Sequence, residues 1–269
     1  MRPAHGRYRF GPRPAARRED GLASNVESAP VPPSARPTRA RVWTRRVLVT
    51  LAWLLLAGAA YLRCRPRPAH LPLSTVVDGP APARAAGVLF YLHGYGGGVA
   101  RAQGLVERLR ADGLPADVSI VLLEGPFSTG LGHSWGDTEE EQATSRARVR
   151  ARLRELLGES GPARARVVIA GFSQGASMAI DLAVEEPRIG GLVSLSPCAS
   201  WLRGELPKRE GLRVLLVHGK HDDTCPVSES RTLAGVLEAA HKPVEYIELE
   251  GGHSVPQQAI HALSTFASH

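Results

Sequence analysis

Short apolar runs alternate along the C-terminal two thirds of the chain with segments whose apolar residues recur every three or four positions. A run of five to seven apolar residues that ends in glycine or a loop is typical of a buried β-strand, and the longer spacing is typical of an amphipathic helix. We expect strands at residues 87–94, 118–126, 166–173, 191–197, 213–219 and 244–252, and helices at 100–113, 138–158, 174–186, 227–241 and 256–267.

The predicted strands are apolar almost throughout, so both faces of their sheet need to be covered. Strict alternation with helices predicts an α/β fold, with a mainly parallel sheet and helices on both faces. In such sheets the chemistry gathers where the strands end at their carboxyl termini. The helix at 138–158 starts with acidic residues after Thr138 and carries arginines later, an order that suits the helix dipole. We expect these charges to form a solvated face.

The chain ahead of this pattern divides into three parts. Residues 1–41 are rich in arginine, proline, alanine and serine, a composition that cannot bury enough apolar surface to fold, and we expect a disordered basic tail. Residues 42–63 hold one hydrophobic segment, which we expect to be a helix that anchors the protein or directs its export. Residues 64–84 are expected to be a linker, and residues 85–269 the catalytic domain.

The apolar core of that segment, residues 47–62, is an uncharged run of 16 residues flanked by arginines on both sides. It is slightly shorter than the roughly 20 residues of a spanning helix. A signal anchor, a cleaved export signal ending near the small residues 57–59, and a twin-arginine signal are all compatible with it. Each would place the domain at a membrane or on the extracytoplasmic side, with membrane contact through residues 47–62.

Charge and cysteine content narrow the function classes. Residues 1–70 hold 14 arginines and 3 acidic residues, whereas residues 71–269 hold 19 basic and 23 acidic ones, so the domain itself is slightly acidic. This argues against a nucleic-acid surface on the domain. The three cysteines are too few for a disulfide scaffold and lack metal-site spacing, so no metal is implied. Cys198 and Cys225 both follow predicted strands. They could pair in an exported domain or remain two small apolar residues.

Ser173 is the candidate nucleophile, because it lies at the centre of a G-x-S-x-G motif between a predicted strand and a predicted helix. A turn this sharp leaves no room for side chains at Gly171 and Gly175. The apical serine projects its hydroxyl out of the sheet, beside the amino end of the following helix.

A serine hydroxyl needs a base to remove its proton, and a third group to orient that base. His253 follows the last predicted strand and two glycines, which makes it the candidate base. Asp222 and Asp223 follow the preceding strand, and either carboxylate would complete the order serine, acid, histidine.

The loop "HGYGGG" at residues 93–98 ends the first long strand and resembles an HGG-type oxyanion loop. The backbone N–H groups of Tyr95 and Gln174 are the candidate donors to a developing oxyanion. The loop lacks the lysine and the glycine spacing of phosphate-binding motifs, so no nucleotide or other cofactor is implied.

Taken together, these segments resemble the α/β-hydrolase fold, and within it the phospholipase/carboxylesterase family that includes acyl-protein thioesterases. The resemblance covers residues 85–269 and is carried by "LHGYGG" (92–97), "HSWGD" (133–137), "GFSQGA" (171–176), "HGKHDDTCP" (218–226) and "GGHS" (251–254). The family's spacing favours Asp222 over Asp223. It also implies that Trp135 lines the acyl site, and Phe127 is a second candidate, although either could be a core residue.

The expected activity is that of a serine hydrolase that cleaves carboxylic esters through an acyl-enzyme on Ser173. The resemblance adds thioesters and lysophospholipids as variant substrates, so the partner would be a small-molecule or lipid ester. A polyester or feruloyl esterase, or a peptidase, on the same fold is the alternative among enzymes. A catalytically silent, membrane-held binding protein is the alternative outside them.

Overall fold

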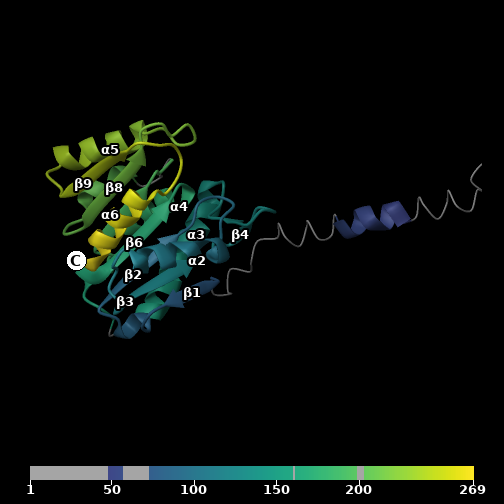
Figure 1. Ribbon diagram of the computed structural model, residues 1–269, viewed down its shortest axis with the longest axis horizontal. Helices are drawn as coiled ribbons and strands as arrows, with labels where there is room; N and C mark the ends of the chain where they lie inside the picture. Colours follow the sequence, from purple (N-terminus) through teal and green to yellow (C-terminus); the bar gives the residue numbers. More distant parts are fainter. Residues whose placement is uncertain (1–47, 57–72, 160, 199–202) are drawn as a thin grey trace, which may run out of the picture. The chain divides into compact units, whose positions relative to one another are not determined.

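The computed structural model describes residues 48–56, 73–159, 161–198 and 203–269 (Figure 1). The chain divides into two units, residues 1–50 and 51–269, and the whole central sheet belongs to the second. Residues 48–56 are helical. The remainder of the expected segment 42–63, the tail 1–41 and the linker residues 64–72 lie outside the described residues. Among the helices that are described, none combines the length and the apolar character needed to cross a membrane.

Seven strands form the central sheet in the order β1-β3-β2-β6-β7-β8-β9. Every neighbouring pair is parallel except β1 and β3, which are antiparallel. The strands are β1 (Thr75–Asp78), β2 (Gly87–Leu92), β3 (Val118–Leu123), β6 (Val167–Phe172), β7 (Gly191–Leu195), β8 (Arg213–Gly219) and β9 (Val244–Leu249). A separate hairpin pairs β4 (Phe127–Ser128) with β5 (His133–Ser134). The expected mainly parallel α/β sheet is therefore confirmed.

The folded domain begins earlier than residue 85. Strand β1 pairs with β3 from Thr75↔Leu123 onward, and the 3₁₀ helix η1 (Pro82–Arg84) follows it, so residues 73–84 belong to the domain and not to a linker. The boundary was missed because β1 has only four residues and lies half-buried at the sheet edge, so it shows no apolar run.

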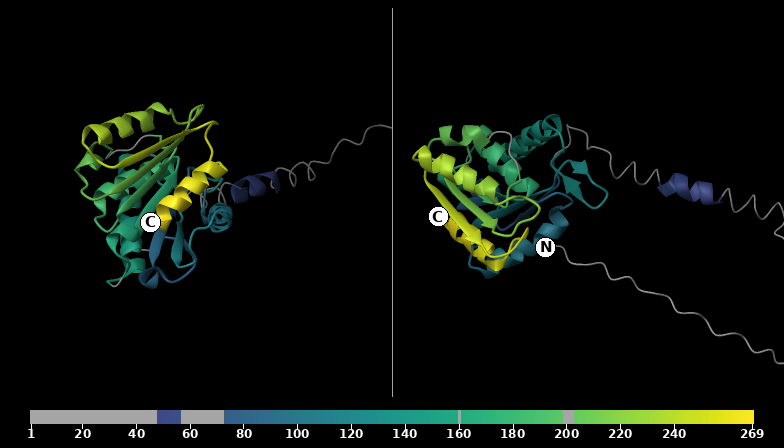
Figure 2. Two further views of the ribbon diagram at one scale, coloured as in Figure 1. Left: turned by 60° about the vertical axis from the view of Figure 1, so that its left-hand side comes forward. Right: turned by 90° about the horizontal axis from the view of Figure 1, so that it is seen from above.

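Helices cover both faces of the sheet, which separates the core into two layers (Figure 2). Phe90 and Leu92 of β2 pack on one side, whereas Leu89 and Tyr91 pack on the other, as the two-residue period of a strand requires. One layer contains side chains of α3 (Glu139–Leu157), α4 (Gln174–Glu185), α5 (Ser228–Ala239) and η3 (Arg203–Lys208), and the other those of α2 (Val99–Ala111) and α6 (Gln257–Ser268). A further 3₁₀ helix, η2 (Arg164–Arg166), precedes β6.

The arginines of α3 do not all form a solvated face, which corrects the expectation from the sequence. The side chain of Arg146 is 5% exposed and contacts three acidic groups: Asp181 at 3.4 Å and Glu185 at 3.0 Å on α4, and Glu139 at 2.7 Å. Asp181 and Glu185 lie one turn apart and present their carboxylates to α3. Part of the charge run, centred on Arg146, thus forms a buried contact between α3 and α4. The predicted cap is confirmed, since Thr138 Oγ1 accepts from the N–H of Glu141 at 3.2 Å.

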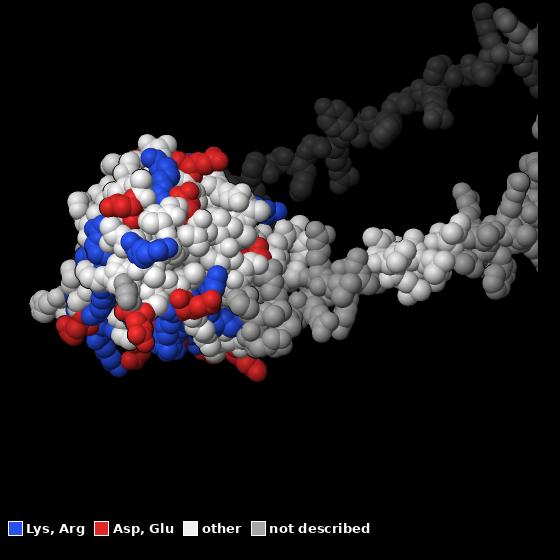
Figure 3. All heavy atoms as spheres, turned by 90° about the horizontal axis from the view of Figure 1, so that it is seen from below, with Lys and Arg blue, Asp and Glu red and all other residues white. Residues whose placement is uncertain are grey.

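The remaining surface carries charges of both signs. On the face drawn in Figure 3, basic and acidic side chains are interspersed rather than gathered by sign. Arg231, for example, pairs with Glu248 through two hydrogen bonds of 2.7 and 2.8 Å.

The strand register brings the loops of interest to one edge of the sheet. Leu92 pairs with Gly171, and Phe172 pairs with Leu195, so β2, β6 and β7 end together. Gly219 is paired with Leu249, so the loops after β8 and β9 also start side by side. The carboxyl ends of these strands therefore present their loops to a common edge, as expected for an α/β sheet.

Candidate active site

Ser173 occupies the sharp turn between β6 and α4, and its backbone is held in an unusual conformation. Its φ is 57° and its ψ −122°, a combination that non-glycine residues seldom adopt. The two motif glycines have a direct steric reason: a Cβ on Gly171 would lie 2.1 Å from the carbonyl oxygen of Gly175, and a Cβ on Gly175 2.2 Å from that of Leu92. Close backbone contacts therefore require glycine at positions 171 and 175.

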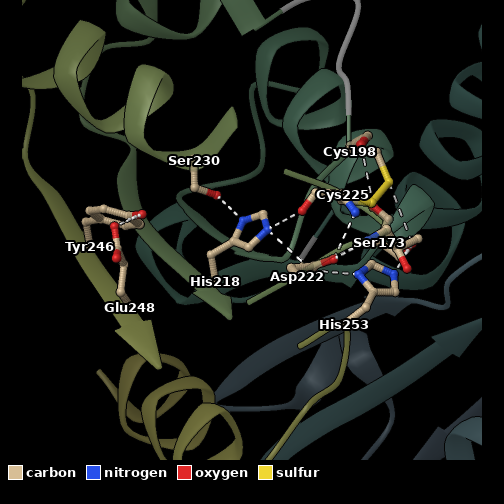
Figure 4. Close-up of polar contacts among 11 residues, drawn as sticks. Ser173, Cys198, His218, Asp222, Cys225, Ser230, Tyr246, Glu248 and His253 are labelled. Atoms are coloured by element: carbon tan, nitrogen blue, oxygen red, sulfur yellow. Dashed lines mark hydrogen bonds and ion pairs between the residues drawn. A yellow bond between two sulfur atoms is a disulfide. The ribbon is translucent and has the colours of Figure 1, made fainter. Parts of the chain in front are cut away.

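The structure brings the three predicted side chains together (Figure 4). His253 Nε2 lies 2.9 Å from Ser173 Oγ, and His253 Nδ1 lies 2.7 Å from Asp222 Oδ2. Because the carboxylate accepts, Nδ1 carries the proton and donates it to Asp222, which leaves the Nε2 lone pair to accept from the serine hydroxyl. This is the geometry of a nucleophile, a base and an orienting acid.

Hydrogen bonds on both oxygens of Asp222 fix its carboxylate. Oδ1 accepts from the backbone N–H of Thr224 at 3.0 Å and of Cys225 at 2.8 Å, while Oδ2 accepts from His253. Burial alone would raise the pKa of Asp222, but the Cys225, His253 and Thr224 hydrogen bonds outweigh it and hold the pKa below its ordinary value. Asp223, the other candidate from the sequence, is exposed.

A buried histidine and a disulfide surround the acid. His218 Nε2 donates to the carbonyl of Cys225 at 2.9 Å and lies 3.4 Å from Asp222 Oδ2, and its Nδ1 is 2.8 Å from Ser230 Oγ. Cys225 forms a disulfide with Cys198, which follows β7. Of the two possibilities left open by the sequence, the structure shows the paired one. Cys198 Sγ lies 3.9 Å from Ser173 Oγ, so the disulfide also borders the nucleophile.

The glycine-rich loop after β2 lies beside the nucleophile and is held from behind. A Cβ on Gly94 would be 3.2 Å from Ser173 Cβ. His93 is buried, and it bridges two loops: Nδ1 donates to the Gly94 carbonyl at 2.8 Å, and Nε2 accepts from the Gly125 N–H at 3.0 Å. Burial lowers the pKa of His93, despite the opposing effect of its backbone hydrogen bond, which is consistent with the neutral ring that this pairing requires.

Trp135 supports the same loop and has no exposed surface. Its ring Nε1–H donates to the carbonyl of His93 at 2.8 Å, and the two rings lie 5.2 Å apart. The Trp135 N–H donates to the side-chain oxygen of Gln174 at 3.0 Å, and the Gln174 amide donates to Gly136 at 2.8 Å. These contacts fit the core role that the sequence left open for Trp135 and do not bring it to an open surface. Phe127, in β4, is half-buried.

The two backbone donors expected from the sequence belong to residues next to the site: Gln174 follows Ser173, and Tyr95 follows Gly94, which lies beside Ser173. Gln174 is the first residue of α4, where N–H groups have no acceptor within the helix. In the neighbouring loop, the N–H groups of Gly96 and Gly97 are used by the carbonyls of His133 and Gly94. Tyr95 lies between Gly94 and these two residues. Within the described residues, no cluster of histidine, cysteine or acidic side chains is arranged to hold a metal ion.

The three residues expected from the sequence, Ser173, His253 and Asp222, thus converge in the structure, whereas the groups that hold them in place were not expected. His218 has no role in the expected order of serine, acid and histidine, although its place at the end of a predicted strand was a signal that it lies near the site. The support of the glycine loop by Trp135 and by the Gln174 side chain had no signal in the sequence, because it joins segments 39 to 42 residues apart.

Comparison with known proteins agrees with this fold. Solved structures that resemble the chain include esterase PE8, with 24% identity and a TM-score of 0.63 over 73% of this chain and 98% of that one. A Bacillus cereus carboxylesterase matches with 20% identity and a TM-score of 0.58 over 74% and 94%, and a Mesorhizobium loti carboxylesterase with 18% and 0.60 over 75% and 97%. No curated protein resembles the sequence closely enough to count as a relative. The phospholipase/carboxylesterase family model matches residues 74–269, so the chain belongs to this family of α/β-hydrolases.

Proposed function

We propose that the protein is a serine hydrolase that cleaves carboxylic esters through an acyl-enzyme on Ser173. The observation that carries the proposal is the continuous hydrogen-bond chain from Ser173 Oγ through His253 to Asp222, with distances of 2.9 and 2.7 Å. Family membership supports ester hydrolysis in general. The acyl-enzyme, the individual roles and the substrate are our proposals.

In the first step, His253 Nε2 takes the proton of the Ser173 hydroxyl as Oγ attacks the carbonyl carbon. The positive charge that develops on the ring is stabilised by Asp222, whose own position is fixed by two backbone N–H groups. His253 then protonates the departing alkoxide, and the acyl group remains on Ser173. A water molecule, deprotonated by His253, hydrolyses this ester and restores the enzyme.

The tetrahedral intermediate carries a negative oxygen that needs hydrogen-bond donors. We propose the N–H groups of Tyr95 and Gln174 for this role, and each would contribute about 3 to 4 kcal/mol in the transition state. Gln174 is suited to it by its place at the amino end of α4, where the helix dipole favours negative charge. His93 and Trp135 would hold the Tyr95 loop at the correct distance.

Carboxylic esters come first among substrates, with acyl thioesters and lysophospholipids as variants. A chain-length series of nitrophenyl esters, measured beside acyl thioesters and a lysophospholipid, separates these. Feruloyl and polyester substrates, and a peptide amide, test the alternative activities of the same site. The acyl length that gives the highest kcat/KM identifies the preferred class.

Covalent labelling by a fluorophosphonate probe tests the mechanism itself, since the probe phosphonylates only an activated serine. We expect the wild-type protein to be labelled and Ser173→Ala to remain unlabelled while keeping the same unfolding curve. A well-folded wild-type protein that resists the probe would instead favour a silent, hydrolase-like binding protein.

We also propose that the domain acts outside the cytoplasm, either anchored or exported through residues 47–62. The uncharged run between arginines supports this, and so does the disulfide, since disulfides persist mainly in oxidising compartments. Cell fractionation of the full chain and of a form lacking residues 42–63 tests it. Retention of the full chain in the cytosol would contradict the proposal.

A further inference from the structure

The disulfide between Cys198 and Cys225 differs from an ordinary surface staple in its position. It joins the segment that follows β7 to the loop that follows β8, and these flank the nucleophile and the acid respectively (Figure 4). Cys225 is fully buried, with 0% exposure. The cross-link therefore lies inside the catalytic machinery of the proposed function.

Cys225 is held from three directions at once. Its backbone N–H donates to Asp222 Oδ1 at 2.8 Å, its carbonyl accepts from His218 Nε2 at 2.9 Å, and its sulfur is bonded to Cys198. His218 is itself buried and tied to Ser230 on α5. A displacement of the Cys225 backbone would therefore move a hydrogen-bond donor of the catalytic carboxylate.

The partner sulfur lies against the nucleophile. Cys198 Sγ is 3.9 Å from Ser173 Oγ, and a disulfide sulfur carries no proton. It can therefore only accept from the serine hydroxyl, and at 3.9 Å it is a weaker acceptor than His253 Nε2, which lies 2.9 Å away. In the reduced protein, a thiol at this position would add a donor beside the nucleophile and would free the Cys225 loop from the segment after β7.

We propose that the Cys198–Cys225 disulfide is a positioning element of the active site, which holds the Asp222 loop against Ser173 and makes the hydrolase activity sensitive to reduction. This inference rests on the proposed function. Reduction is a two-electron step: a dithiol reductant forms its own disulfide, and the S–S bond is converted into two protein thiols. Cys198 and Cys225 are thus positioning residues that act through Asp222.

The experiment uses the full chain carrying Cys64→Ser, so that only these two cysteines remain. Second-order acylation by the fluorophosphonate probe and kcat and KM for a short nitrophenyl ester are measured before and after treatment with dithiothreitol, with the redox state read by mass spectrometry. We expect reduction to slow acylation and kcat by about 10- to 100-fold, the cost of misplacing a catalytic group by about 1 Å, and KM to change little. Reoxidation should restore the rate.

Two variants separate positioning from general stability. Cys198→Ala/Cys225→Val keeps apolar packing without the cross-link, and it should show the reduced rate and no response to dithiothreitol. Arg110→Ala removes the contacts of Arg110 with Asp78 and Pro115, outside the site, so it should lower the melting temperature but leave acylation below that temperature unchanged. Equal loss of rate in Arg110→Ala, or full activity in the Cys198→Ala/Cys225→Val variant, would overturn the proposal.

A separate measurement tests whether the disulfide affects the rate by holding Asp222 in place. If the disulfide acts by holding that carboxylate, reduction should cost much less in an Asp222→Asn background, because two changes to one unit are not additive. An undiminished effect of reduction in that background would refute the route. Should the oxidised protein take up no probe at all, the proposed function fails. Should it be labelled at the same rate in both redox states, only the positioning role fails.

Discussion

His253 Nδ1 lies 2.7 Å from Asp222 Oδ2, while Asp223, the very next residue, is exposed. Two adjacent carboxylates are therefore separated into one that orients the imidazole and one that meets solvent. The sequence allowed either, and the family's spacing favoured the first.

Asn substitutions at the two positions should separate them by rate. Asp222→Asn keeps the shape of the side chain but removes the charge that, in the proposed mechanism, stabilises the imidazolium and selects its tautomer. Acylation should therefore slow by about 10³- to 10⁴-fold. Asp223→Asn, its matched control, should retain the wild-type rate. Fluorophosphonate labelling kinetics measure both, and equal rates would contradict the assignment.

The glycine at the start of the nucleophile turn should tolerate no side chain. A Cβ at Gly171 would lie 2.1 Å from the carbonyl oxygen of Gly175, so Gly171→Ala must displace main chain. We expect it to lower the free energy of unfolding by about 3 kcal/mol or more, the upper end of what overpacking costs. Gly104, on the exposed side of α2, has no atom within 4 Å of such a Cβ. Gly104→Ala should therefore stabilise the protein by about 0.5 to 1 kcal/mol. Urea unfolding checks the opposite signs.

Trp135→Phe should slow the reaction although Trp135 touches no solvent. The change removes the donor to the His93 carbonyl and loosens the loop that carries Tyr95. We expect kcat to fall by about 10-fold, less than the loss of an oxyanion donor itself, with KM nearly unchanged. Ile260→Val is the control for lost packing, because Ile260 is buried on α6. It should lower the free energy of unfolding by about 0.5 to 1.5 kcal/mol without slowing kcat. Parallel losses of rate in both variants would argue against a role for the loop support.

The Arg231–Glu248 pair should make the free energy of unfolding depend on pH in the acid range. Hydrogen bonds from Arg231 and then from Tyr246 lower the pKa of Glu248 from 4.5 to about 2. Because this pKa is depressed in the folded state, ionised Glu248 stabilises the fold above pH 4.5. That stabilisation is lost as the pH falls from about 4.5 to about 2. Glu248→Gln should thus be modestly less stable than wild type at pH 7, and equally stable near pH 2. Glu245→Gln, exposed on the same strand, is the control. A difference that persists unchanged in acid would contradict the prediction.

The parallel strands and the convergence of Ser173, Asp222 and His253 could be predicted because their signals are local. Each buried strand is a continuous apolar run, and Ser173, Asp222 and His253 each follow one of these runs within a few residues. The register of a parallel sheet then brings the ends of β6, β8 and β9 to one edge without further information.

What escaped prediction depends on contacts between distant segments or on elements too short for a periodic signal. Strand β1 has four residues and the hairpin strands β4 and β5 have two each. The pairing of Cys198 with Cys225 follows from the distance between two loops, which neither cysteine's neighbours encode. Likewise, Arg146 can be buried because it pairs with Asp181 and Glu185 on α4. The composition of α3 alone predicts a helix that faces solvent.

The separation of the reacting groups along the chain also has a consequence for biogenesis. His253 contacts Ser173 across 80 residues and Asp222 across 31, from the loop that follows β9. Since contacts of such long range form late in folding, hydrolytic competence should arise only when β9 and its following loop have joined the sheet. During synthesis, the turn that carries Ser173 thus emerges well before His253 can contact it, and the proposed serine chemistry has to wait until residues 244–253 have been made and have folded.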